Sequence, residues 1–463
     1  MNRKSLKIPF LICFFLITQC LIPAFGQVSD SAVVRNIYSA ALLNDAAYNN
    51  LKYLCKNIGG RIAGSPESLK AVEWGKRILE EIGLDNVYLQ ETKVRNWIRG
   101  EKETGRIYSG KSGNKDIWVS ALGTSVGTGI NGIKAKVVEV KSLDTLRILG
   151  ETNISGKIVF FNRPTDQRNI NTGSAYGGAA DQRVRGAIEA SKFGAVGVII
   201  RSLSTAFDEY PHTGIMRYAD TIKKIPAFST GTSNADLLSR MIKDDSNIEL
   251  FLKSECKEND EVKSYNVVAE IMGTEFPEEI ILIGGHLDAW DTCEGAHDDG
   301  TGVIHCYEVL RLFKQLGIKP RHTIRAVFFM DEEIAQRGAR TYAETVKAKN
   351  EKHIAAIESD AGGFLPLGFS CEISDDKLMK MQQWKSLLQP YGIFFIEKGW
   401  SGVDISFLKE QDFPLMELVT NSQRYFDYHH SPADVFETVN RRELQLGSAS
   451  IASLVYLIDK YGL

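Results

Sequence analysis

Short apolar runs alternate with amphipathic segments through the C-terminal half of the chain. Runs typical of buried strands occupy 267–271, 280–284, 324–329, 354–357 and 415–419. Segments with the helical period occupy 301–316, 339–349, 404–409 and 442–461. Strands that alternate with helices in this way predict the α/β class, with a mostly parallel mixed sheet sandwiched by helices.

The N-terminal half shows a different order of elements. Helical patterns cover most of residues 34–84, and a strand is predicted at 86–94. From residue 115 to 260, short β-rich runs joined by glycine-rich connections replace the helical pattern. We therefore predict a main domain in two parts, 27–114 and 261–463, interrupted by an insert at 115–260.

The first residues have the pattern of a targeting segment. Positive charges within residues 3–7 precede an apolar stretch at 8–22, and small residues follow at 24–26. This pattern predicts a signal peptide over 1–26, and therefore a secreted or periplasmic protein. The apolar stretch is shorter than the ~20 residues that a membrane span needs. Lipid attachment through Cys20 is the alternative, but the residue before it fits that motif poorly.

Composition narrows the class of protein further. The chain has 463 residues, of which 43% are hydrophobic and 24% are charged, as in globular proteins. Its formal net charge of −3 gives no support for binding to nucleic acid or to anionic membranes. The cysteines that follow the predicted signal peptide form no CxxC pair. They therefore indicate neither a disulfide framework nor a thiolate zinc site.

Histidine and acidic residues gather directly behind the predicted strand 280–284. The stretch GGHLDAWDTCEGAHDDGTG places His286 at the carboxyl end of that strand. Asp288 follows at a spacing that lets its carboxylate accept the free ring N–H of a metal-bound His286. Asp298 and Asp299 come just before the predicted helix 301–316. One of these two carboxylates is placed to bridge two metal ions.

Three more predicted strands end in the same kinds of side chain. Glu332 and Glu333 follow strand 324–329, and Asp360 follows strand 354–357. The last strand is followed by the adjacent residues His429 and His430. Functional residues in such sheets collect at the carboxyl ends of strands. Nitrogen and oxygen donors without thiolates predict a zinc site, and manganese or cobalt is also compatible.

Each cluster by itself has a structural interpretation. A single histidine at a strand end usually makes an ordinary hydrogen bond, and two adjacent glutamates often form a solvated pair. Asp298 and Asp299 also fit the cap of the helix that begins at Thr301. The occurrence of all four clusters at strand ends, in this order, favours a metal centre.

The order of these motifs resembles the co-catalytic zinc exopeptidases. The run is H-x-D, then G-x-x-D-D-G-x-G, then D-E-E, then E-S-D-A-G, then H-S-P-A-D. The versions GGHLDAWD, ESDAG and HHS are most similar to the carboxypeptidase Q branch of that family. Within the insert, GKIVFF and FGAVGVII resemble the protease-associated domain. The resemblance implies the zinc exopeptidase fold, interrupted by that module.

The resemblance also implies a role for each site residue. Two zinc ions are expected, with Asp298 as the bridging ligand and Glu332 as general base and acid. Of the two histidines, His430 matches the family's ligand, since it precedes a hydroxyl residue and stands four positions before Asp434. Asp288 and Asp299 are expected to support the ligands. The remaining ligands are one pair on each ion: His286 with Asp360, and Glu333 with His430.

The reaction implied is hydrolysis of dipeptides or short peptides by a metal-activated water with Glu332 as its base. Four residues are candidates for holding the substrate: Asp404 for an ammonium group, Arg424 for a carboxylate, and Tyr428 or His429 for the oxyanion. Each of the four also fits a solvent-facing loop residue.

Other functions are compatible with parts of this pattern. An aminopeptidase that trims longer peptides needs the same ligands, and the metal site does not determine which peptide end is read. A non-catalytic binding protein on the same fold is a second alternative, but the complete ligand set argues against it. A glutaminyl cyclase is a third, with one zinc ion. The branch resemblance also leads us to expect a homodimer.

Overall fold

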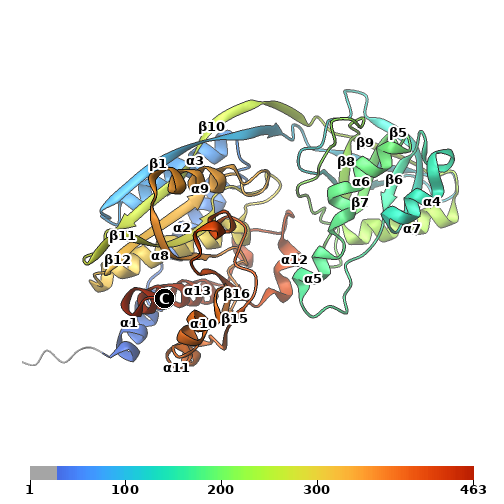
Figure 1. The fold of residues 1–463 in the computed structure, drawn as a ribbon. Coiled ribbons are helices and arrows are strands. Elements are labelled where there is room, and N and C mark those ends of the chain that lie inside the picture. The colour runs from blue at the N-terminus through green and yellow to red at the C-terminus, as the bar shows by residue number, and fades with distance from the viewer. Residues whose placement is uncertain (1–28) are drawn as a thin grey trace, which may run out of the picture.

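The computed structural model describes residues 29–463, so the predicted signal peptide lies outside the described residues. The described chain has two parts, each built around its own sheet (Figure 1). The predicted α/β class is confirmed. Within residues 29–463, no helix has both the length and the apolar character needed to span a membrane.

The main sheet has eight strands in the order β1-β10-β12-β11-β13-β16-β14-β15. Strands β12, β11, β13 and β16 are parallel neighbours at its centre, while β1, β10 and β14 pair antiparallel with their inner neighbours. The bounds are β1 Asn86–Ile98, β10 Lys257–Ile271, β11 Phe276–His286, β12 His322–Phe329, β13 Lys352–Glu358, β14 Pro366–Glu372, β15 Phe395–Lys398 and β16 Leu415–Thr420.

All predicted strands of this sheet are present, and two strands were not predicted. Strand β10 begins ten residues earlier than its apolar run, because its first half is polar and pairs only with β1. Strands β14 and β15 are short and mix polar with apolar residues, so no period marks them. They extend the sheet beyond β16, at the edge away from β1.

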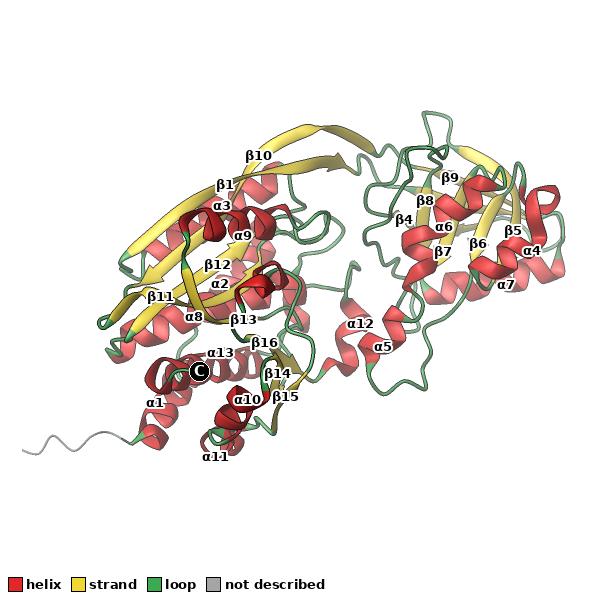
Figure 2. Ribbon diagram, in the orientation of Figure 1, coloured by secondary structure: helices red, strands yellow, loops and turns green. Residues whose placement is uncertain are grey.

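Helices cover both faces of the main sheet (Figure 2). Successive strand residues point to opposite faces: Ile281 and Ile283 face one helical layer, while Leu282 faces the other. The first layer contains α1 Asp30–Leu42, α2 Ala46–Tyr53, α3 Pro66–Glu80, α8 Thr301–Leu316 and α13 Arg441–Tyr461. The second layer contains α9 Arg337–Lys349 and the 3-10 helix η4 Ile405–Gln411, which is close to the predicted helix 404–409.

A second eight-stranded sheet lies mostly within the insert, in the order β3-β2-β9-β5-β6-β7-β8-β4. Its identity as a protease-associated domain stays a prediction. The strands are β2 Thr104–Tyr108, β3 Lys115–Ile117, β4 Val119–Ala121, β5 Ile133–Val140, β6 Ile158–Phe161, β7 Gly197–Arg201, β8 Ala227–Thr230 and β9 Glu249–Lys253. The helices around it are α4 Leu143–Ile154, α6 Ala180–Lys192 and α7 Thr232–Asp244.

The two parts meet along several segments, and two of these bear on the position of the site. The long ribbon of β1 and β10 leads from the main sheet to the insert (Figure 1). Helix α5 (Thr172–Gly177) of the insert returns to lie beside α12 (Tyr425–Tyr428) of the main domain. Since α12 directly precedes His429 and His430, the second meeting place lies against the predicted metal centre.

Candidate metal centre

The carboxyl ends of three neighbouring parallel strands bring the predicted ligands to one edge of the main sheet. Strand β11 ends at His286, β12 is followed by Glu333, and β13 is followed by Asp360. Asp298 lies in η2 (Ala296–Gly300), directly before α8. His430 reaches the same edge from the loop after α12.

Asp298 stands between two pairs of side chains. Its Oδ1 lies 3.2 Å from His286 Nε2, which in turn lies 3.4 Å from Asp360 Oδ1. Its Oδ2 lies 3.3 Å from His430 Nε2, which lies 3.0 Å from Glu333 Oε2. Each oxygen of one carboxylate therefore serves a different pair.

Several oxygens at this site are buried without a hydrogen-bond partner among residues 29–463. They are Asp298 Oδ2, Glu333 Oε1 and Asp360 Oδ1. Burying a charged oxygen is costly unless it is paired or coordinates a metal. Two clusters of potential ligand atoms pass through Asp298, one with His286 and Asp360 and one with His429 and His430. Imidazole and carboxylate donors fit zinc.

The buried carboxylates of the site favour positive charge on the groups beside them. Burial alone lowers the pKa of His286, but the carboxylates of Asp360 and Asp298 outweigh it and raise the pKa well above its usual range. Glu333 and Asp298 do the same to the pKa of His430. Burial raises the pKa of Glu333 to about 7. Divalent cations would supply the charge that protons otherwise supply.

Asp288 supports the site through a different atom from the one predicted. The ring Nδ1 of His286 lies 3.0 Å from the backbone carbonyl of Asp288, and 3.8 Å from its carboxylate. The carboxylate instead accepts the backbone N–H groups of Asp331, Glu332 and Glu333, at 2.8, 3.1 and 3.3 Å. Asp288 therefore orients the loop that presents the two glutamates.

The carboxylate of Asp299 accepts backbone N–H groups, and the peptide bond between Asp298 and Asp299 is cis. Its Oδ2 accepts the backbone N–H of His286 at 3.0 Å, and its Oδ1 accepts that of Gly302 at 2.9 Å. Asp299 is fully buried. The side chain ties the end of β11 to the beginning of α8.

Glu332 lies at the same edge, partly buried beside Glu333, the predicted ligand. Burial, followed by the neighbouring Asp360 and Asp404 carboxylates, raises the pKa of Glu332 well above its usual range. A carboxylate whose pKa is raised in this way is a stronger base than an exposed one.

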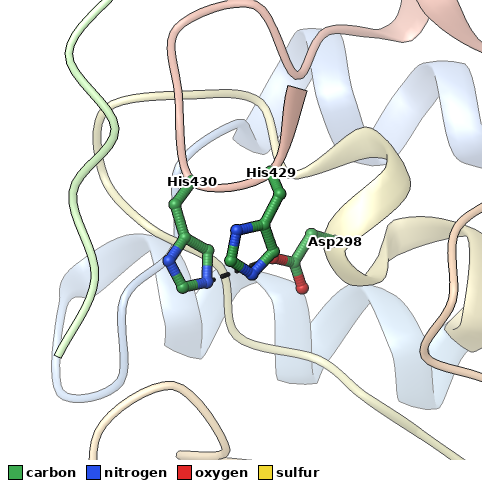
Figure 3. Close-up of side chains that lie close together, drawn as sticks. All are labelled: Asp298, His429 and His430. Carbon is green, nitrogen blue, oxygen red and sulfur yellow. Dashed lines mark ion pairs between the residues drawn. The ribbon is translucent and has the colours of Figure 1, made fainter. Parts of the chain in front are cut away.

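His429 stacks directly on His430, with ring centroids 3.5 Å apart (Figure 3). Its Nε2 lies 3.7 Å from Asp298 Oδ2, which is farther than the 3.3 Å of His430 Nε2. His430 also contacts Glu333, so it is the better placed of the two for the second pair.

The remaining substrate-binding candidates occupy different surroundings. Asp404 is buried, and neither of its carboxylate oxygens has a hydrogen-bond partner in the described part of the chain. Arg424 is exposed, with its guanidinium 5.1 Å from the ring centroid of Tyr428. The Tyr428 ring stacks on His297 at 5.5 Å. Asp404 is thus the only one of these three that lies among the site carboxylates.

A pocket of about 610 Å³ opens beside the candidate metal centre. Asp360 and His429 belong to its lining. Both parts of the molecule contribute to it: Tyr176 comes from the insert, and Phe426 from α12. The other lining residues are Asn171, Gly173, Ser174, Ala361, Trp400, Gly402, Val403, Glu417, Val419, Thr420, Ser422 and Tyr425.

Three supporting residues were missed in the sequence. The carboxylate of Asp434 accepts the backbone N–H groups of His297 at 2.7 Å and Asp298 at 3.2 Å. The buried guanidinium of Arg61 donates to backbone carbonyls of the loop after β11, among them Leu287 at 2.6 Å. His212 of the insert contacts His429. Of the three, only Asp434 could have been found from the sequence, because its spacing from His430 belongs to the motif.

Known proteins share both the sequence and the fold. A profile of peptidase family M28 matches residues 266–455. Carboxypeptidase Q of Bos taurus is 34% identical over 438 residues, which make up 94% of this chain and 89% of that protein. The chain belongs to peptidase family M28. This membership confirms the predicted resemblance and the predicted enzyme class, a zinc metallopeptidase of the exopeptidase type.

Solved structures agree with this membership. A peptidase M28 precursor from Shewanella amazonensis SB2B is 33% identical to this M28 peptidase, with a TM-score of 0.88 over 93% of this chain and 96% of that chain. A zinc aminopeptidase from Bacillus subtilis has a TM-score of 0.64 at 18% identity, over 89% and 94% of the two chains. The second likeness concerns the fold alone.

Proposed function

We propose that this M28 peptidase is a secreted exopeptidase that hydrolyses dipeptides or short peptides with two zinc ions. The observation that carries the proposal is the position of Asp298, whose two oxygens face two separate pairs of ligands. A site for one ion would not need the second pair, His430 and Glu333. In that pair His430 Nε2 lies 3.0 Å from Glu333 Oε2, beside the other oxygen of Asp298. In this proposal Asp298 bridges, His286 and Asp360 hold one ion, and Glu333 and His430 hold the other.

The chain's own residues divide the chemistry between them. Zinc bound at such a site lowers the pKa of water and polarises the scissile carbonyl. Glu332 takes the proton of the attacking water and returns it to the leaving amine. Asp288 holds the backbone of the Glu332 loop, so the base keeps its position as the proton moves. Proton transfer of this kind contributes roughly 10²–10⁴-fold to the rate.

The pocket beside Asp360 supports a small substrate. Its volume of about 610 Å³ is in the range of small-ligand sites. The aromatic rings of Tyr176, Phe426 and Trp400 offer apolar surface for one side chain. Because the insert helix α5 closes one side, a long peptide has less room to continue there than a dipeptide does.

The charges around the pocket support recognition of a free amino end. Besides the proposed ligand Asp360, its lining contains the carboxylate of Glu417 and, among residues 29–463, no lysine or arginine. The buried carboxylate of Asp404 lies close by without a hydrogen-bond partner in the same range. Unpaired carboxylates attract an ammonium group. An aminopeptidase acting on longer peptides uses the same feature, so it is the second candidate.

Other parts of the proposal rest on the sequence. Secretion or periplasmic location rests on the pattern of residues 1–26. The homodimer and the identity of the insert as a protease-associated domain rest on the resemblance. The possibility of manganese or cobalt in place of zinc rests on the types of donor atom. Arg424, Tyr428 and His429 stay candidates for contacts with the substrate carboxylate and the oxyanion.

A substrate mixture tests the proposed function. The zinc-loaded protein is incubated with free dipeptides, longer unblocked peptides and peptides blocked at either end, and the products are read by mass spectrometry. We expect cleavage of free dipeptides, and loss of ~10²–10⁴-fold in rate for Glu332→Ala with its metal retained. Stepwise loss of residues from long peptides identifies the aminopeptidase alternative.

Metal content separates the remaining alternatives. Two zinc ions per chain without any cleavage would mean that the hydrolytic site is intact and that its substrate belongs to another class. One zinc ion per chain, together with cyclisation of an N-terminal glutamine, favours a glutaminyl cyclase. Near-normal turnover of Glu332→Ala contradicts the role of that residue as the base.

A further inference from the structure

His430 has a backbone conformation that its own sequence does not favour. Its φ angle is +60°, in the left-handed region that residues with a Cβ atom adopt only rarely. Such a conformation persists when surrounding contacts determine it. The question is therefore which contacts hold the backbone that presents this side chain to Asp298 and Glu333.

The contacts on both sides of His430 come from the insert. The ring Nδ1 of His212 lies 2.7 Å from the carbonyl oxygen of His429, and the backbone N–H of Thr213 donates to the carbonyl of His430 at 2.9 Å. Since a carbonyl only accepts, Nδ1 carries the proton. His212 is itself held, because its backbone N–H donates to Ser202 Oγ at 2.8 Å.

The same stretch of the insert holds the residues before the histidine pair. Ser204 Oγ donates to the carbonyl of Phe426 at 2.9 Å, and Thr205 Oγ1 donates to the Asp427 carboxylate at 2.6 Å. The Tyr176 ring meets the His429 ring edge-on, with centroids 5.1 Å apart. The whole segment 426–430 is therefore attached to the insert.

Gly214 completes this contact. Its φ angle is +125°, and a Cβ atom there would lie 2.7 Å from His430 Nδ1. A glycine at this position lets the insert backbone approach the imidazole itself. The insert thus touches His430 at its carbonyl through Thr213 and at its ring through Gly214.

We propose that His212 is a positioning residue for the metal centre: by donating from Nδ1 to the His429 carbonyl, it sets the backbone that aims His430 at its ligand position. The proposal rests on the proposed function in that His430 is taken as a metal ligand. His212 is buried and lies 217 residues from its partner in the chain. It gives the insert a part in the metal site beyond any contact with substrate.

A purely structural role for His212 makes a different prediction for conservative variants. The amide nitrogen of asparagine reaches the position of Nδ1, whereas that of glutamine reaches the position of Nε2. Nε2 of His212 has no hydrogen-bond partner in the described residues. If the donated bond matters, His212→Asn retains function and His212→Gln does not, although glutamine is closer to histidine in size.

The first experiment titrates zinc into the full-length protein and its variants in the presence of a competing chelator. For His212→Ala and His212→Gln we expect the affinity of one of the two ions to fall about 10- to 100-fold, as for other residues that orient metal ligands. His212→Asn should recover most of that loss, and the other ion should be unaffected.

His353→Ala is the matched control. His353 is also buried and hydrogen-bonded through its ring, at 2.8 Å to the Tyr342 hydroxyl, but lies in β13 away from the metal edge. The His353→Ala variant should lower the midpoint of thermal unfolding without changing the affinity for either zinc ion. Unchanged zinc affinity in His212→Ala, or equal recovery by glutamine and asparagine, overturns the proposal.

A second measurement keeps the test separate from the proposed function. Hydrogen exchange of the metal-free protein reports on segment 426–431 whether or not zinc binds there. We expect about 3- to 10-fold faster exchange in His212→Ala and wild-type exchange in His212→Asn, as for loss of one hydrogen bond. If wild-type protein binds only one zinc ion while this pattern holds, the proposed function fails and the positioning role stands. Unchanged exchange in His212→Ala contradicts the positioning role.

Discussion

The two halves of the candidate metal centre are held by different parts of the chain. The half with His286 and Asp360 stands on strand ends of the main sheet, and Asp299 binds the His286 backbone from the next helix. In the other half, His430 lies in a loop with a left-handed backbone and hydrogen bonds to the insert. One half thus depends on local strand geometry, and the other on docking between two domains.

This difference predicts which half of the centre a substitution elsewhere in the molecule will affect. A change in the insert should affect the His430 half first, while a change at the end of β11 should affect the His286 half. Asp298 joins the two halves, since each of its oxygens serves one of them.

Removing Asp298 should have the largest effect, because it breaks both halves together. For Asp298→Ala we expect loss of both zinc ions and turnover at background level, since among residues 29–463 no other carboxylate lies within 4.0 Å of both His286 and His430. Metal content by mass spectrometry and peptide hydrolysis measure this. Glu332→Ala is the comparison, which should keep both ions. Two ions bound to Asp298→Ala would show that the halves are independent.

Removing Asp299 should affect one half only. For Asp299→Ala we expect about 10- to 100-fold weaker binding of one ion, because the His286 N–H loses its acceptor. Chelator competition measures both affinities. Asp245→Ala is the matched control: Asp245 is also buried and accepts N–H groups, including that of Asn247 at 2.9 Å, but lies in the insert. Equal weakening of both ions would contradict the separation of the halves.

The smallest expected effect is on stability: removing the metal should change Tm by an amount that depends on pH. Burial raises the pKa of Glu333, Glu358 and Asp434 to about 7 in the metal-free protein. The folded state then keeps protons that the unfolded state releases above pH ~4.5, so the stabilisation is complete below that pH and is lost as pH rises through about 7.

Zinc should offset part of this loss, because Glu333 is a proposed ligand and a bound cation stabilises its charged form. We expect the zinc-induced rise in Tm to be a few degrees larger at pH 7.5 than at pH 5. Differential scanning calorimetry of chelator-treated and zinc-loaded protein measures both values. An equal rise at the two pH values would mean that the protonation of Glu333 is not linked to metal binding.

Much of the fold and of the site was predictable from local pattern. Apolar runs predicted the central strands, and polar residues behind them predicted the edge where His286, Asp298, Glu333 and Asp360 meet. The choice of His430 over His429 needed the family resemblance. Strands β14 and β15 had no period to identify them.

The prediction for Asp288 shows the limit of spacing. Its distance along the chain from His286 is right for a supporting residue, but the backbone carbonyl and not the carboxylate takes the ring N–H. Spacing places a residue near another, while the rotation of the side chain depends on what else surrounds it. Here three N–H groups of the 331–333 loop compete for the carboxylate and hold it.

The sequence by itself determined the α/β class, the sheet edge that carries the chemistry and the donor types gathered there. These follow from backbone periods and from the rule that parallel strands end at a common edge, both of which are local. Only the tertiary structure decided that the insert reaches the metal centre through His212. That contact joins residues 217 positions apart, and its formation depends on how two domains pack, for which a single chain carries no periodic signal.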